Sequence, residues 1–231
     1  MATVRQNFRC GVILNYDDSD IYESRVEELG HINPSLEFWL YNNAPDINNA
    51  LVVGAGFGLS SKQLVQAGAT VTSVEPQSDR FALLESNVPE STNINKMCSS
   101  SAGTSNLVYF EDNKSGGAIN RSMGDTSETV DVITVDSLNL SPNLMLVYAN
   151  GKELDVIDGA SSTMTANPTM KIILKWIPDL IEDIDVAIAK LKSYGKTIKI
   201  IHWESQGDEI SYKDVTDEIL KAVITADLLL E

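Results

Sequence analysis

The chain of 231 residues is long enough for one well-buried α/β domain with a small N-terminal addition. Its formal net charge of −16 would repel a polyanion, which argues against DNA or RNA as a partner. The two cysteines, Cys10 and Cys98, form no C-x-x-C pair and have no close histidine. The sequence therefore indicates neither a disulfide framework nor a zinc site.

No stretch of the sequence approaches the ~18 apolar residues that a membrane span needs, and the first residues lead into no apolar signal segment. We therefore expect a soluble, unprocessed and cytoplasmic protein with no membrane partner. The two histidines, His31 and His202, are expected to be structural, because a triad or metal site would have little else to draw on. We expect no metal site.

Residues 1–49 are polar and irregular, apart from a strand-like patch at 11–15 and a few aromatic residues close to residue 50. We interpret this segment as a cap over the sheet edge or over a cofactor pocket. The predicted domain organisation is therefore a cap at 1–49 and a main domain at 50–231.

From Ala50 onward, apolar runs alternate with segments of helical periodicity, and this alternation predicts a parallel sheet. The segment 91–129 is rich in Ser, Asn, Thr and Gly with short apolar pieces, which favours a meander with a flexible loop. The predicted strands are 51–53, 70–74, 130–135, 144–148, 170–174 and 197–203, and the predicted helices are 60–66, 78–87, 152–159, 179–194 and 212–228.

A glycine-rich turn follows the first of these strands, at Gly54, Gly56 and Gly58, and an acid, Glu75, ends the second. In a parallel βαβ unit both lie at the carboxyl ends of the strands, where the ligand crevice forms, and such an acid suits ribose hydroxyls. The third glycine of a dinucleotide fingerprint is replaced by Leu59, so the spacing disfavours NAD. The absence of a Walker lysine pattern excludes a P-loop. The turn fits S-adenosylmethionine (SAM) better, because no phosphate needs a cradle; the alternative is a turn that only joins strand to helix.

The stretch from about Ala50 to Trp203 resembles the FkbM family of SAM-dependent methyltransferases. The match is ordered and has several parts. It comprises the glycine turn at 54–58, Glu75-Pro76, the variable segment Lys114-Ser-Gly-Gly, the strand Val132-Ile-Thr-Val-Asp-Ser-Leu, and the strand and helix from Leu144 to Gly159-Ala160.

The sequence departs from the family where chemistry is expected. The family's Asp-x-Glu-Gly turn aligns with Tyr148-Ala-Asn150-Gly151, so both carboxylates are replaced, although the helix acid Glu153 remains. The acid usually found at the end of the next strand aligns with Lys175, and the usual Asp of the first strand corresponds to Val52.

The resemblance implies an α/β protein with a Rossmann-like class I methyltransferase fold, in which a mostly parallel central sheet is flanked by helices. It implies that SAM binds across Gly54, Ala55, Gly56 and Gly58, with Glu75 on the ribose. The implied reaction is O-methylation of a small-molecule or sugar hydroxyl. Tyr148 and Asn150 are the candidate catalytic residues because they stand at the family's acceptor-binding turn, and the alternative is that Tyr148 only fills the vacated space.

The lost acids also motivate a non-enzymatic hypothesis. Methyl transfer asks a protein mainly to align a nucleophile and to supply a base, and the base is what these replacements remove. The alternative function is therefore an inactive methyltransferase-like domain, serving as a structural or binding component of a homo-oligomer, a larger assembly or a viral particle.

Overall fold

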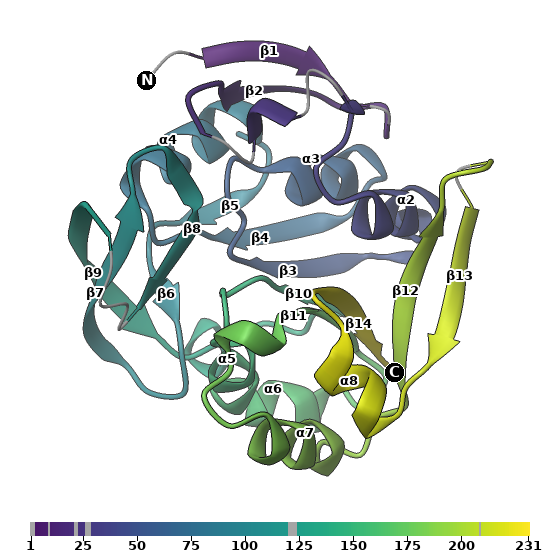
Figure 1. Cartoon of the computed structure of the whole chain (residues 1–231). Coiled ribbons are helices and arrows are strands. Elements are labelled where there is room, and N and C mark those ends of the chain that lie inside the picture. Colours follow the sequence, from purple (N-terminus) through teal and green to yellow (C-terminus); the bar gives the residue numbers. More distant parts are fainter. Residues whose placement is uncertain (1–2, 9, 21–22, 26–28, 120–123, 208) are drawn as a thin grey trace.

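The computed structural model describes residues 3–8, 10–20, 23–25, 29–119, 124–207 and 209–231. Its centre is an eight-stranded sheet (Figure 1). In spatial order the strands are β13 (Glu209–Asp214), β12 (Ile198–Glu204), β14 (Ala226–Leu230), β11 (Lys171–Trp176), β10 (Leu144–Val147), β3 (Asn49–Val53), β4 (Thr70–Val74) and β5 (Thr92–Ile94). The strands from β11 to β5 are parallel, as predicted, whereas β14 is antiparallel to both of its neighbours.

The central strands β3 and β10 are almost wholly apolar because both faces of the sheet are covered there. In β10, Leu144 and Leu146 pack into the core on one face, while Met145 and Val147 pack into the core on the other. All four side chains are buried. This two-sided burial is why the strand appears in the sequence as an unbroken apolar run.

Helices form one layer on each face of the sheet (Figure 1). One layer consists of α2 (Pro34–Asn43), α3 (Leu59–Gln66) and α4 (Ser78–Asn87). The other consists of α5 (Glu153–Asp158), α6 (Ser161–Ala166), α7 (Ile184–Ser193) and α8 (Asp217–Ala222). Within the described residues, no helix has the length and apolar character that a membrane crossing requires.

A smaller sheet of four strands lies beside β5, in the order β6 (Met97–Cys98), β9 (Thr126–Ile133), β7 (Gly103–Phe110) and β8 (Asn113–Ile119). The antiparallel pairs of β7 with β8 and β9 confirm the predicted meander. The variable segment Lys114-Ser-Gly-Gly belongs to β8. A separate hairpin, β1 (Thr3–Asn7) and β2 (Ile13–Asp17), packs Leu14 and Tyr16 near Phe57.

The predicted helix at 212–228 is wrong. The segment contains the end of β13, the short helix α8, and the start of β14. The run Ala226-Asp-Leu-Leu-Leu is buried at every position, and a short apolar run of this kind fits a central strand as well as a buried helix. The run forms a strand because it inserts between β11 and β12, where both faces of a strand are buried.

The start of α7 and the presence of α2 also differ from the sequence prediction. The expected helix at 179–194 begins at Ile184, where the Asp183 side chain accepts hydrogen bonds from the backbone N–H groups of Asp185 and Val186. The segment expected to be irregular before residue 50 contains α2, which starts at Pro34 and buries Trp39 in the sheet core.

Candidate functional site

The site lies where the strand order of the large sheet reverses. From β3 the chain proceeds outward through β4 to β5, and then returns to form β10 and β11 on the other side of β3. In open α/β sheets, ligands bind in the crevice outside the carboxyl ends of the strands at such a switch point. A cavity of about 550 Å³ occupies this position. Its walls include the residues that follow β3, β4, β10 and β11.

The turn after β3 requires glycine for its backbone path. Gly54, Gly56 and Gly58 all have positive φ angles, of 75°, 56° and 102°. A Cβ atom on Gly54 would lie 1.9 Å from the carbonyl oxygen of Tyr148, so glycine allows the ends of β3 and β10 to approach each other. At Gly56 an added Cβ would meet nothing within 4 Å, and this residue borders the cavity.

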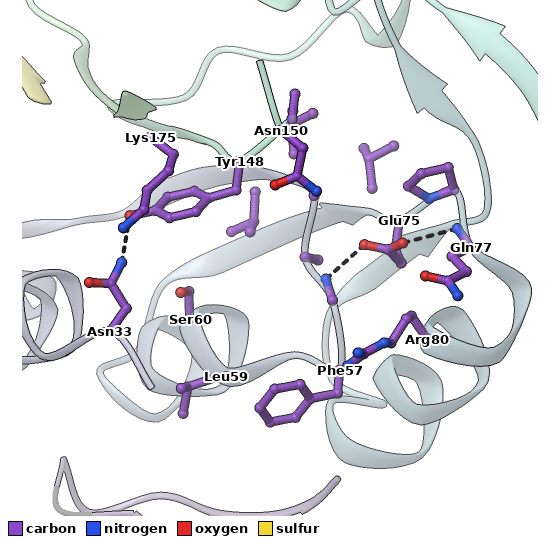
Figure 2. Close-up of a pocket in the computed structure, with 18 of the residues that line it drawn as sticks. Asn33, Phe57, Leu59, Ser60, Glu75, Gln77, Arg80, Tyr148, Asn150 and Lys175 are labelled. Carbon is purple, nitrogen blue, oxygen red and sulfur yellow. Dashed lines mark hydrogen bonds between the residues drawn. The ribbon is translucent and has the colours of Figure 1, made fainter. Parts of the chain in front are cut away.

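Glu75 lies at the end of β4 against this turn (Figure 2). One carboxylate oxygen accepts a hydrogen bond of 2.8 Å from the Gly56 N–H, and the other accepts one of 2.9 Å from the Gln77 N–H. The side chain is only 6% exposed, and its burial raises the pKa of Glu75 to about 7 despite these two hydrogen bonds. An ionised carboxylate offers about four acceptor positions, so two remain for a ligand.

A buried ion cluster fixes the N-terminal segment to α4 beside the same cavity. The guanidinium of Arg80 donates to Asp20 at 2.6 Å and pairs with Glu23. All three side chains are buried, and Arg80 and Glu23 border the cavity. The N-terminal segment, interpreted from the sequence as a cap over the sheet edge or over a cofactor pocket, thus contributes Glu23 to the cavity wall, and these ion pairs hold it to α4.

At the other end of the cavity, polar side chains from four segments meet, and Figure 2 shows three of them, Asn33, Tyr148 and Lys175. The Tyr148 hydroxyl donates to Asp227 Oδ1 at 2.7 Å, and the Asn33 side-chain amide donates to both groups at 3.2 Å. Lys175 Nζ lies 3.4 Å from the same Asp227 oxygen. Asn33, Tyr148 and Lys175 border the cavity, whereas Asp227 is 3% exposed and lies behind them.

The loop after β10 is held by Glu153, the first residue of α5. Its carboxylate accepts hydrogen bonds from the backbone N–H groups of Ala149 at 2.9 Å and Gly151 at 3.0 Å. Burial raises the pKa of Glu153 to about 7. The loop between them places Asn150 at a positive φ of 48° on the cavity wall.

Most residues predicted from the sequence lie around this one cavity. Its lining includes Gly54, Ala55, Gly56, Glu75, Tyr148 and Asn150. Gly58 is not part of the lining: it precedes α3, and a Cβ there would lie 2.7 Å from Val88 Cγ2. Gly58 therefore serves the packing of α3 rather than the cavity surface.

Sequence reasoning missed two members of the polar group, Asn33 and Asp227. Each of these two residues stands in a sequence pattern that could have identified it. Asn33 directly precedes Pro34, a dipeptide typical of a turn or helix start, and it is the residue before α2. Asp227 is the single charge in the run Ala226-Asp-Leu-Leu-Leu, and a charge inside a buried strand needs partners.

The histidines lie outside this polar group. His31 is buried and packs its ring edge-on against Trp203, with 5.0 Å between ring centroids. His202 is part of β12. In the part of the chain that the structure describes, no three His, Cys, Asp or Glu side chains are grouped so that they would hold a metal ion.

Comparison with known proteins gives structural matches only. No protein-family model matches the sequence, and no curated protein sequence matches it. Among solved structures, the chain is similar to a TehB-like SAM-dependent methyltransferase from Corynebacterium glutamicum, with a TM-score of 0.52 and 12% identity over 92% of this chain and 96% of that one. It is also similar to a SAM-dependent methyltransferase from Agrobacterium tumefaciens, with a TM-score of 0.51 and 9% identity over 100% of this chain and 70% of that one. Identities this low establish the fold alone: the chain has the Rossmann-like class I methyltransferase fold that its sequence predicts.

Proposed function

We propose that the protein is a SAM-dependent methyltransferase, with SAM bound across Gly54, Ala55 and Gly56 and its ribose held by Glu75. The observation that carries this proposal is the position of Glu75, a buried carboxylate beside the glycine turn at the switch point of the sheet. A carboxylate there suits ribose hydroxyls, which are hydrogen-bond donors.

The residues present fit this cofactor in three respects. The open backbone at Gly56 leaves room for a ligand, because an added Cβ would contact nothing. Glu75 keeps acceptor capacity after its two backbone hydrogen bonds. The cavity volume of about 550 Å³ is within the range of about 300–1,000 Å³ that is usual for small-molecule and cofactor sites.

When bound, SAM supplies a methyl group that is already activated on a sulfonium. The protein therefore needs to orient an acceptor and to receive its proton. In this proposal the acceptor is a hydroxyl of a small molecule or sugar, and it lies against Tyr148 and Asn150, which border the cavity beyond the glycine turn. We assign the protein to a group resembling the FkbM methyltransferases, on the motifs at 54–58, 75–76 and 144–160.

The alternative is an inactive domain kept for assembly. Such a domain has no need of an open crevice, and side chains such as Tyr148 would fill the space left by the lost acids. The cavity at the switch point is open and continues from Glu75 to Tyr148. This openness supports the cofactor-binding function over the alternative.

Isothermal titration of the full chain with SAM tests the proposal. We expect the wild-type protein to bind SAM and Glu75→Ala to bind it roughly tenfold to a hundredfold more weakly, because hydrogen bonds to a charged group are lost. Glu90→Ala is the matched control, since Glu90 is exposed and pairs with Lys62 away from the cavity lining. Absence of binding to the wild type, or equal binding to Glu75→Ala, would contradict the proposal.

A further inference from the structure

Asp227 is a charged residue inside a central strand. Every residue of β14 is buried, and the Asp227 side chain is 3% exposed. Burying a carboxylate lowers the stability of the folded state unless the carboxylate is paired and hydrogen-bonded. A strand of this kind would be more stable with an apolar side chain, so the presence of Asp227 calls for a function.

The register of the sheet fixes the partners of Asp227. In the antiparallel pairing of β11 with β14, Asp227 lies directly opposite Lys175. Its Oδ1 receives the Tyr148 hydroxyl at 2.7 Å, the Asn33 amide at 3.2 Å and Lys175 Nζ at 3.4 Å. The shortest of these contacts is the one from Tyr148. Lys175 balances the negative charge, and Asn33 holds both Tyr148 and Asp227 in place.

The polar group formed by Asp227 and its three partners lies at the wall of the cavity. Tyr148 and Lys175 border the cavity and Asp227 does not, so Asp227 can reach a ligand only through them. Tyr148 lies at the end of β10, next to Asn150, where the sequence lacks the acids of the resembling family. The parallel strands β10 and β11 thus carry no carboxylate at the positions where the resembling family has one. The Asp227 carboxylate, on the antiparallel strand β14, lies next to those positions but farther from the cavity.

We propose that Asp227 is a positioning residue that makes Tyr148 the proton acceptor for the hydroxyl compound being methylated. This inference rests on the proposed function. As the acceptor oxygen bonds to the methyl carbon, its O–H bond breaks and its proton moves to the Tyr148 oxygen, while the Tyr148 proton moves to Asp227 Oδ1. The electron pair of the methyl–sulfur bond leaves with the sulfur, which changes from a sulfonium to a neutral thioether. Asp227 ends protonated, and after the methylated product leaves, the relay releases one proton to solvent through Tyr148, so that Tyr148 is again a hydroxyl and Asp227 again a carboxylate.

The first arm of the test examines the Tyr148–Asp227 contact in the free protein. The chain has seven tyrosines, so the Cζ resonances of ¹³C-labelled tyrosine form a small set, and the Tyr148 signal is the one missing from Tyr148→Phe. We expect Asp227→Asn to shift this signal. Glu231→Gln is the matched control. Glu231 directly follows β14, at the other end of the strand from Asp227, and it pairs with Lys199. An unchanged Tyr148 signal in Asp227→Asn would overturn the proposal.

The second arm measures S-adenosylhomocysteine formation with phenol and methyl glucoside as hydroxyl probes, together with SAM binding by titration. We expect Asp227→Asn and Tyr148→Phe each to lower kcat by at least ~100-fold, with SAM binding and the KM for SAM unchanged. The double variant should lose no more than either single one, because both residues serve one proton path. Tyr148→Phe keeps the buried charge pair of Asp227 with Lys175, so it remains informative if Asp227→Asn does not fold.

The outcomes separate this inference from the proposed function. A wild-type protein that binds no SAM contradicts the proposed function itself. A protein that binds SAM but methylates neither probe overturns the hydroxyl assignment made here. A kcat for Asp227→Asn equal to that of the wild type, or losses that add in the double variant, would make Asp227 a purely structural residue.

Discussion

At the residue scale, two opposing influences act on the carboxyl group of Glu75. Burial favours the protonated form, whereas the N–H groups of Gly56 and Gln77 favour the ionised form. Burial is the larger effect and raises the pKa to about 7. The residue proposed to bind ribose therefore changes its charge near neutral pH in the free protein.

This titration predicts a pH dependence of SAM binding. Ionised Glu75 is the form that accepts two ribose hydrogen bonds, so the affinity should fall as the pH drops through about 7. We expect SAM to bind roughly tenfold more weakly at pH 6 than at pH 8, as measured by isothermal titration. Glu75→Gln should bind weakly at both pH values, and a wild-type affinity that is constant between them would count against this role.

The carboxyl group of Glu75 also affects the stability of the fold. Here the protonated form is the favourable one, whereas ribose binding favours the ionised form. The folded-state pKa of about 7 lies above the ordinary value of 4.5, so the folded protein holds this proton more tightly than the unfolded chain does. The stabilising contribution is complete below about pH 4.5 and is lost as the pH rises through 7. Urea unfolding of the wild type and Glu75→Gln should show this difference, which amounts to roughly 3 kcal/mol over the window. Glu153 titrates in the same range, so only the difference between the two proteins isolates Glu75.

Substitution by alanine should lower the stability of the fold more at Gly54 than at Gly56, although both glycines belong to the same turn. Gly54→Ala places a Cβ 1.9 Å from the Tyr148 carbonyl oxygen, so β3 and β10 must separate, and we expect a loss of at least about 2 kcal/mol in urea unfolding. Gly56→Ala meets no atom within 4 Å and should lose only about 1 kcal/mol for its positive φ. Because Gly56 borders the cavity, its added methyl group should weaken SAM binding instead. Equal losses of stability in the two variants would contradict this assignment.

At the scale of elements, β14 shows how a central strand differs from the helix that its sequence suggested. Leu228 packs into the core on one face of the sheet and Leu229 into the core on the other. Periodicity cannot reveal this, because five consecutive buried positions carry neither a period of 2 nor one of 3.6. The neighbours that bury them, β11 and β12, are placed only by the complete fold.

Alanine substitutions test this strand. Leu228→Ala and Leu229→Ala should each lower the free energy of unfolding by about 2–5 kcal/mol, because each leaves a cavity in a separate core layer. Ile219→Ala, in α8, should lower it by less than about 1 kcal/mol, since Ile219 is 37% exposed. If either leucine behaved like Ile219, the two-sided burial of β14 would be wrong.

Helix α2 was missed for a related reason. Its residues Leu36 to Leu40 are buried in succession, including Glu37, so the amphipathic pattern of a surface helix is absent. The buried Glu37 carboxylate accepts hydrogen bonds from the N–H groups of Ile32 and Asn33, which precede the helix. The α3 and α4 helices, by contrast, were predicted within one residue of their observed bounds because they alternate polar and apolar positions around one buried face.

At the scale of the whole molecule, the parts of the site differ in how far the sequence could predict them. The glycine turn and Glu75 belong to one βαβ unit, whose geometry is local, and their position at one cavity follows from that unit. Asn33, Tyr148 and Asp227 are separated by more than 70 residues from one another, and only strand order and register bring them together. The sequence alone therefore predicts the cofactor end of the cavity better than the acceptor end.

The place of β14 in the sheet has a consequence for how the molecule folds. Residues 226–230 are the last strand in chain order, yet they join β12 and β13 to the rest of the sheet. During synthesis, β12 and β13 can pair with each other, but no strand connects them to β11 until β14 has formed. Such late, long-range pairing is slow. The Asp227 carboxylate arrives in the same step. A partly folded chain that already has the glycine turn and Glu75 would thus still lack the polar group at the acceptor end of the cavity.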